Sequence, residues 1–315
     1  MSAGSERLRV AIIGLGDIAQ RVYLPLFAAR GELELVFVTR NEATLARLAG
    51  QYRPSAAYTG LDAALGGGLD AAFVHAATEA HPQLVRALLD AGVPTYVDKP
   101  LADTLAEAEA LAALARARNT PLMVGFNRRF APGYAELVGR PPDLILMQKN
   151  RIGLADEPRR VIFDDFIHVL DTLRFLQTGP VARMEVAAKI EGGLLHHVVV
   201  HLMGEGWAAT GLMNRMSGAN EEALEVMGGG AKRRVVNLAE VIDYAGAETL
   251  HRRGDWTPVA RQRGLEQAVD FFVQAVRAGR MLDAAEAVET HRLCEEVLSR
   301  VPSSLAGEGG RGAAG

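Results

Sequence analysis

Residues 8–19 of the chain have the sequence LRVAIIGLGDIA, in which a mostly apolar run leads directly into two glycines. Gly14 permits a tight turn, and Gly16 leaves room for a phosphate group to approach the backbone. Ala19 is small enough for a following helix to pack closely on the strand, and the first N–H groups of that helix attract phosphate. The order of strand, glycine turn and helix predicts a dinucleotide-binding turn, with an ordinary glycine turn as the alternative.

Apolar runs and helical segments continue to alternate from this turn to Val124. The expected strands are residues 8–13, 33–38, 56–58, 70–75, 95–97 and 121–124, and the expected helices are residues 17–30, 41–52, 80–91 and 104–118. Asn41, Thr78 and Thr104 stand where they would cap the last three helices. Such alternation is typical of a parallel sheet covered by helices on both faces. We expect an α/β fold whose N-terminal domain, residues 1–124, is a doubly wound Rossmann sheet.

The pattern changes after Phe126, where prolines interrupt the chain and strands follow one another closely. The expected strands are residues 144–151, 182–190, 195–203, 206–213, 222–226, 231–238 and 241–244, and the expected helices are residues 164–176, 265–278 and 284–300. Consecutive strands joined by short turns form antiparallel sheets. Residues 125–302 are therefore predicted to be an α+β domain for substrate binding and oligomerisation, with a large, open, mostly antiparallel sheet covered on one face by the last two helices. Residues 303–315 are expected to be a flexible tail.

The composition excludes several classes of protein. The 315 residues include 34 Lys and Arg against 38 Asp and Glu, and the net charge of -4 argues against nucleic acid as a partner. Cys294 is the single cysteine, so no disulfide forms within the chain. Neighbouring histidines at 196 and 197 face opposite sides of a strand, so we expect no metal site. No run approaches the ~18 apolar residues that span a bilayer, and we expect a cytoplasmic protein without a membrane partner.

The end of the second strand bears on the choice of cofactor. An NAD-binding domain usually places Asp or Glu there to bind the ribose, whereas this chain has Thr39 and Arg40. The Arg40 guanidinium can pair with the 2′-phosphate of NADP, so NADP is expected over NAD, with a solvated arginine at a helix start as the alternative. The expected cofactor-binding residues are Gly14, Gly16, Asp17, Ile18, Thr39, Arg40, Ala76, Ala77, Thr78, His81 and Lys99.

Lys99 belongs to the triplet Asp98-Lys99-Pro100, which directly follows the fifth expected strand. Ligands of doubly wound sheets bind outside the carboxyl ends of the strands, where Lys99 is expected to lie. The segment 75–81, HAATEAH, follows the fourth strand at the same edge and would line the nicotinamide end of a dinucleotide site. Both motifs therefore point to one edge of the sheet.

With these motifs, the chain resembles the Gfo/Idh/MocA family of NAD(P)-dependent sugar and polyol oxidoreductases over nearly its whole length. The resemblance rests on residues 14–19, on residues 98–100 and on the segment 164–171, DDFIHVLD. The family usually has Glu-Lys-Pro, so Asp98 is a conservative departure that should leave the lysine in place. The segment 124–132, VGFNRRFAP, is most similar to the branch related to the virulence factor MviM.

The family also usually has an Asp four residues before a helix His, as Asp164 and His168 are here. In a helix, side chains at this spacing project from one face. Hydride transfer to or from a carbon requires that a proton join or leave the neighbouring oxygen, and an imidazole exchanges protons near neutral pH. We expect His168 to act as acid and base beside Lys99, which would polarise the substrate oxygen, while Asp164 would orient or balance the pair. The alternative is a structural histidine in a helix whose N-terminus is satisfied by acidic residues.

Further polar residues follow the first domain. Arg128 and Arg129 come after its last strand, and paired arginines suit an anionic or polyhydroxylated ligand. The alternative is that one arginine pins the connection between the domains through a carboxylate. The expected substrate-binding residues are Lys99, Arg128, Arg129, Lys149, Asp164 and His168.

Together these patterns predict an NADP-dependent oxidoreductase that transfers a hydride between nicotinamide and a secondary alcohol or ketone of a sugar, polyol or related small molecule. An alternative of another class is a catalytically silent dinucleotide-binding regulator or scaffold of the same fold. A methyltransferase is a third interpretation, which the Lys99 motif disfavours. Few charges lie across residues 198–202, which predicts a homodimer or homotetramer formed through the C-terminal sheet.

Overall fold

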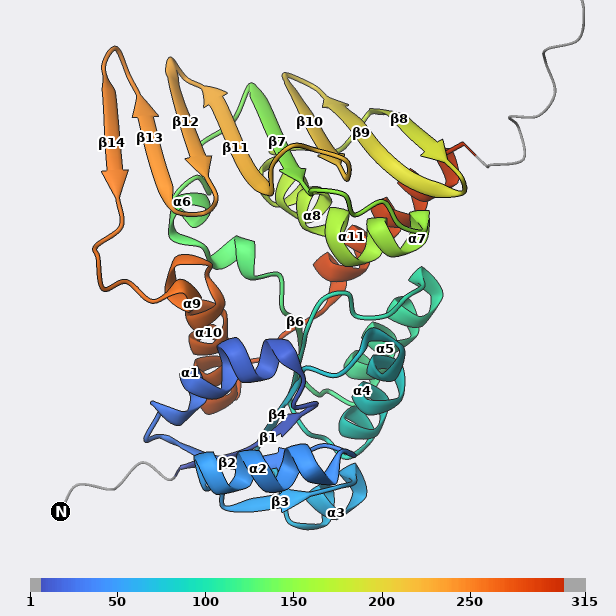
Figure 1. Cartoon of the computed structure of the whole chain (residues 1–315), viewed down its shortest axis with the longest axis vertical. Helices are drawn as coiled ribbons and strands as arrows, with labels where there is room; N and C mark the ends of the chain where they lie inside the picture. The colour runs from blue at the N-terminus through green and yellow to red at the C-terminus, as the bar shows by residue number, and fades with distance from the viewer. Residues whose placement is uncertain (1–6, 303–315) are drawn as a thin grey trace, which may run out of the picture. The chain divides into compact units, whose positions relative to one another are not determined.

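The structure is a computed structural model that describes residues 7–302. The chain divides into two compact units, whose elements are labelled in Figure 1. The first unit contains the residues up to Asn127 together with Gly264–Glu289, and the second contains Arg128–Arg263 and the residues from Thr290 onward. The predicted tail, residues 303–315, lies outside the described residues.

A parallel sheet in the order β3-β2-β1-β4-β5-β6 forms the centre of the first unit. Its strands are β1 (Leu8–Ile13), β2 (Leu33–Val38), β3 (Ala56–Tyr58), β4 (Ala71–Val74), β5 (Thr95–Val97) and β6 (Leu122–Val124). Leu8 pairs with Leu33 and Val10 pairs with Ala71, which places β1 between β2 and β4. The predicted Rossmann sheet is confirmed, and each predicted strand boundary in it lies within one residue of the observed one.

Helices flank this sheet, with α1 and α10 on one side and α4 and α5 on the other (Figure 1). The helices of the unit are α1 (Leu24–Ala28), α2 (Glu42–Tyr52), α3 (Leu61–Gly66), α4 (His81–Asp90), α5 (Leu105–Ala117) and α10 (Leu265–Arg277). Asn41 and Thr104 cap α2 and α5, because each side chain accepts a hydrogen bond from the N–H three residues later. Thr78 does not cap α4, since it begins a 3-10 turn that precedes the helix.

Two features of the first unit were not predicted. The helix after the glycine turn begins as a π-helical turn, Ala19–Tyr23, before it continues as α1. The short helix α3 follows β3 and begins at Leu61, directly after a glycine. A helix of six residues is too short to produce a clear apolar period, so the sequence does not indicate it.

Helix α10 belongs to the first unit, which corrects the expectation that residues 265–278 cover the second sheet. Phe272 of this helix is fully buried, and its ring centre lies 5.1 Å from that of Phe73 and 5.8 Å from that of Tyr96. An amphipathic pattern shows that a helix covers a core, but any apolar surface satisfies the pattern. The aromatic rings of β4 and β5 provide that surface here.

The second unit contains an eight-stranded sheet in the order β14-β13-β12-β11-β7-β10-β9-β8. Its strands are β7 (Leu144–Asn150), β8 (Arg183–Glu191), β9 (Leu194–Gly204), β10 (Trp207–Asn214), β11 (Glu221–Gly228), β12 (Ala231–Val236), β13 (Glu240–Tyr244) and β14 (Glu248–Arg252). All neighbouring strands are antiparallel except β7 and β10, which are parallel. The predicted large, mostly antiparallel sheet is therefore confirmed. The edge strand β14 was missed because its five residues are all exposed and carry no apolar alternation.

One helix of the second unit packs closely on this sheet. The helical elements are the 3-10 turn Asn127–Phe130 at the start of the unit, α6 (Pro132–Ala135), α7 (Pro158–Val161), the π-helical turn Ile162–Phe166, α8 (Ile167–Leu176), α9 (Val259–Gln262) and the last part of α11 (Ala285–Arg300). Gly211 of β10 permits the approach of α8, because a Cβ atom there would lie 2.7 Å from Val169 and 2.9 Å from Leu173. The sheet thus fixes the position of α8, the helix that carries His168.

Candidate active site

A cavity of about 750 Å³ lies at the carboxyl ends of β1, β2 and β4 in the first unit. Six of the residues predicted to bind cofactor line it, namely Gly14, Gly16, Thr39, Arg40, Ala76 and Ala77. The other five predicted residues, Asp17, Ile18, Thr78, His81 and Lys99, are not among the residues that line this cavity. The cavity also includes His75, the first residue of the segment 75–81, and Asp62 of α3, which the sequence did not indicate.

The glycine turn has the shape that a bound pyrophosphate requires. Gly14 has a φ of +85°, and a Cβ atom there would lie 2.5 Å from the backbone nitrogen of Ala76. Any larger residue would therefore strain the turn and collide with the segment after β4. A Cβ at Gly16 would meet nothing within 4 Å, so the backbone at this position is open to a ligand. These residues fit a dinucleotide.

Arg40 also lines this cavity, and its side chain is exposed and makes no hydrogen bond or ion pair within residues 7–302 of the structure. Asn41, the next residue, caps α2. Arg40 is thus available to a phosphate group, whereas the carboxylate of Asp62, which also lines the cavity, would repel one.

The residue before Lys99 is held by two buried aromatic side chains. The Asp98 carboxylate contacts His75 Nδ1 at 2.9 Å and accepts a hydrogen bond from the Tyr23 hydroxyl at 3.0 Å. The Tyr23 and His75 rings stack with their centres 3.8 Å apart. Burial acts to raise the pKa of Asp98, but the attraction of His75 and the two hydrogen bonds outweigh it and lower the pKa. Asp98 is therefore an ionised acceptor at neutral pH.

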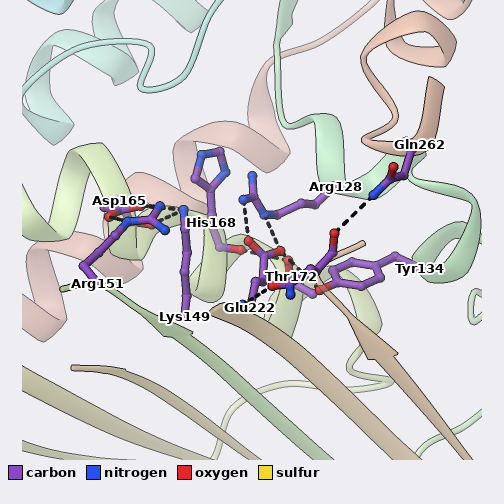
Figure 2. A network of polar contacts seen from close by, with 10 residues as sticks. Arg128, Tyr134, Lys149, Arg151, Asp165, His168, Thr172, Glu222 and Gln262 are labelled. Carbon is purple, nitrogen blue, oxygen red and sulfur yellow. Dashed lines mark hydrogen bonds and ion pairs between the residues drawn. The ribbon is translucent and has the colours of Figure 1, made fainter. Parts of the chain in front are cut away.

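In the second unit, His168 lies in the first turn of α8 and is 9% exposed. Its predicted partner Asp164 lies in the preceding π-helical turn, where its side chain is 47% exposed and 3.7 Å from Arg160. Asp165, the next residue, turns toward the sheet and carries a denser set of contacts (Figure 2). The two adjacent carboxylates therefore have different surroundings.

Three cations share the Asp165 carboxylate. Arg151 donates to both of its oxygens at 2.9 and 3.0 Å, Arg215 donates at 2.7 Å, and Lys149 Nζ lies 2.5 Å from Oδ1. Burial alone would raise the pKa of Asp165, but these cations hold it far below its usual range. Burial also lowers the pKa of Lys149 to about 7, helped by repulsion from Arg128 and opposed by Asp165 and Glu222. The two arginines keep Asp165 ionised even when Lys149 loses its proton.

The predicted substrate-binding arginines both contact carboxylates of the second unit. Arg128 is buried and donates to Glu222 at 2.6 and 2.8 Å, and Glu222 also accepts from the Tyr134 hydroxyl (Figure 2). Arg129 donates to the buried Asp171 at 2.7 Å. These partners could not be predicted, because the sequence does not distinguish a buried acidic residue of a strand or helix from an exposed one. Substrate contact by either arginine stays a prediction.

Within residues 7–302, no three or more His, Cys, Asp or Glu side chains are grouped so that they would hold a metal ion. Within the same part of the chain, no helix is both long and apolar enough to cross a membrane.

Comparison with known proteins agrees with this geometry. Residues 8–126 match the model of the oxidoreductase family with an NAD-binding Rossmann fold, GFO_IDH_MocA, and residues 141–243 match the YceM-like C-terminal domain. YceM of Salmonella typhimurium, whose name describes it as an oxidoreductase, is 34% identical over 280 residues, which cover 86% of this chain and 90% of that protein. The chain belongs to the Gfo/Idh/MocA family of oxidoreductases.

Other members of the Gfo/Idh/MocA family are also similar to this chain. The myo-inositol dehydrogenase Hyg17 of Streptomyces leeuwenhoekii is 30% identical over 85% of this chain and 73% of its own length. The crystal structure of the dehydrogenase MviM from Clostridium difficile superposes with a TM-score of 0.87 at 29% identity, covering 93% of this chain and 99% of that one. The resemblance to this family and to its MviM-like branch, seen first in the sequence, is confirmed.

Proposed function

We propose that this oxidoreductase transfers a hydride between the nicotinamide of NADP and a secondary alcohol or ketone of a sugar, a polyol or a related small molecule. The observation that carries the proposal is the cavity at the carboxyl ends of β1, β2 and β4, whose glycine turn leaves the backbone open to a pyrophosphate. The name of the relative Hyg17, a myo-inositol dehydrogenase, supports a polyhydroxylated substrate. In this proposal residues 1–124 bind the cofactor and residues 125–302 bind the substrate.

The residues of the chain have distinct roles in this proposal. Gly14, Gly16 and the segment after β4 would hold the pyrophosphate, and the bound nicotinamide would supply or accept the hydride. Lys99 would donate a hydrogen bond to the reacting oxygen and stabilise negative charge on it. His168 would give a proton to that oxygen during reduction and take it during oxidation, while Asp164 would balance the charge of the pair.

A coupled assay tests the proposed reaction. Purified protein should oxidise NADPH in the presence of at least one member of a panel of ketoses, aldoses, oxidised inositols and nucleotide-linked keto sugars. Absorbance at the nicotinamide wavelength reports turnover, and mass spectrometry identifies the alcohol that forms. Tight cofactor binding without turnover across the whole panel would instead support a silent dinucleotide-binding regulator.

Arg40 is expected to determine the preference for NADP. A charge-assisted hydrogen bond is worth about 1.5–3 kcal/mol, so Arg40→Ala should raise the Kd for NADPH roughly 10- to 100-fold and leave the Kd for NADH nearly unchanged. Asp62→Asn provides the matched control, because removal of this carboxylate from the cavity should tighten NADPH binding. Quenching of protein fluorescence measures both constants. Equal affinity of the unaltered protein for NADH and NADPH would contradict the preference.

We further propose a homodimer or homotetramer formed through the open face of the second sheet. In β7, Ile145 and Met147 are buried, whereas Leu144 and Leu146 on the opposite face are 46% and 43% exposed. Exposed leucines on a central strand favour cover by a second copy. Light scattering should give at least twice the chain mass, and Leu146→Asp should reduce it to that of a monomer. If the unaltered protein is a monomer at micromolar concentration, this assembly is excluded.

A further inference from the structure

Two buried histidines of one segment contact the residues on either side of Lys99. His75 directly follows β4 and contacts the side chain of Asp98, and His81 begins α4 and contacts the carbonyl oxygen of Pro100. We propose that His75 and His81 are positioning residues, which fix the Lys99 amine relative to the cofactor cavity. This inference rests on the proposed role of Lys99 in the reaction.

The contact before Lys99 is enclosed and directional. The His75 side chain is fully buried, stacked on Tyr23, and its Nδ1 lies 2.9 Å from Asp98 Oδ2. Since Asp98 is an ionised acceptor, His75 Nδ1 carries the proton and donates it. The Tyr23 hydroxyl donates to the other oxygen, so the Asp98 carboxylate cannot turn without breaking a hydrogen bond to a buried ring.

The contact after Lys99, between His81 and Pro100, is also buried and directional. His81 is 1% exposed, its Nδ1 lies 2.8 Å from the Pro100 oxygen, and its Nε2 lies 3.0 Å from the Ala76 oxygen. Both partners are carbonyl oxygens, which only accept, so both contacts are hydrogen bonds when both ring nitrogens carry a proton. The ring of His81 therefore ties the residue that follows Lys99 to the segment after β4.

These two contacts connect the lysine to the dinucleotide turn. Ala76, which receives His81 Nε2, lines the cavity and is the residue whose backbone nitrogen closely faces Gly14. The backbone adds one more link, because the Asp98 N–H donates to the Val74 oxygen at 3.0 Å. Residues 98 and 100 are thus both bonded to the segment that would hold the cofactor, and Lys99 lies between them. A flexible lysine stem acts at a defined place only when its backbone is held in this way.

Replacing each histidine by asparagine and by glutamine distinguishes the hydrogen bond made by Nδ1 from the one made by Nε2. An asparagine amide reaches about as far as Nδ1 of histidine and a glutamine amide about as far as Nε2. His81→Asn should therefore keep the bond to Pro100, whereas His81→Gln should keep only the bond to Ala76. His75→Asn should likewise keep the bond to Asp98, and His75→Gln should lose it. His251→Asn, on the exposed edge strand β14, serves as the control.

The position of Lys99 can be followed without turnover. The chain has four lysines, Lys99, Lys149, Lys189 and Lys232, so ¹³C-dimethylation gives a simple NMR spectrum in which Lys99→Arg assigns the signal. The two glutamine variants should shift or broaden the Lys99 signal and leave that of Lys189 unchanged. The two asparagine variants and the control should keep the signal of the unaltered protein. A Lys99 signal that is the same in both members of each pair would overturn the inference.

Turnover separates this inference from the proposed function. With a substrate from the panel, the glutamine variants should lose about 10- to 100-fold in kcat, while the Kd for NADPH changes less than about threefold. If the NMR signals behave as expected but Lys99→Ala leaves turnover unchanged, the histidines position the lysine and the proposed role of the lysine fails. If turnover depends on Lys99 but both members of each pair are equally active, the positioning role fails.

Discussion

Replacement of His168 by alanine should lower kcat by about 10²- to 10⁴-fold, because the reacting oxygen loses the group that exchanges its proton. His168 lies in a helix that the sheet holds in place and is mostly buried, so it is a preorganised group and not a mobile surface residue. The cofactor cavity belongs to the other unit, so the Kd for NADPH should change little. Steady-state kinetics with the substrate found in the panel measure kcat, and fluorescence measures the cofactor affinity.

Two controls make this result specific. His251→Ala removes a histidine from the exposed edge strand β14 and should leave kcat within about twofold. Melting temperatures of both variants show whether the loss comes from unfolding. A folded His168→Ala protein that retains a kcat within threefold of the original value would remove His168 from the mechanism, and the interpretation of a structural helix histidine would then hold.

The nucleotide turn could be predicted because its signal is local. Gly14 and Gly16 follow an apolar strand directly, and a turn with positive φ at Gly14 is an arrangement that glycine adopts readily. The caps at Asn41 and Thr104 are local for the same reason, since each bonds to an N–H three residues away. Features that depend on residues close together in the sequence can therefore be predicted from it.

The choice between two adjacent carboxylates could not be read from the sequence. Helical spacing pairs Asp164 with His168, and that spacing indicated nothing for Asp165. The cations that hold Asp165 come from residues 14 to 50 positions away along the chain, on or after β7 and β10. The turn that contains both carboxylates is also π-helical, which alters the directions of side chains from those of the regular helix that was expected. Predicting the ion-pair cluster would have required knowing how the strands of the second sheet pair.

The same cluster gives the largest expected effect on stability. Asp165→Ala should lower the free energy of unfolding by about 3–5 kcal/mol, because loss of one partner leaves buried cations without their carboxylate. The Asp165 side chain is 15% exposed, and the side chains of Lys149 and Arg215 are 3% and 10% exposed. Asp164→Ala is the matched control at the next position, where the half-exposed carboxylate should contribute less than about 1 kcal/mol. Urea unfolding followed by circular dichroism measures both.

The dependence of this loss on pH and on Lys149 tests its cause. The cations lower the pKa of Asp165, so its contribution is complete above the unfolded pKa of about 4 and declines as the pH falls below that value. The difference between Asp165→Ala and the unaltered protein should therefore shrink in acid. Lys149→Met removes one of the uncompensated charges, so the double variant should lose less stability than the sum of the two single variants. Additive losses, or a difference that persists unchanged at pH 3, would show that Asp165 stabilises the turn through packing and not through its charge.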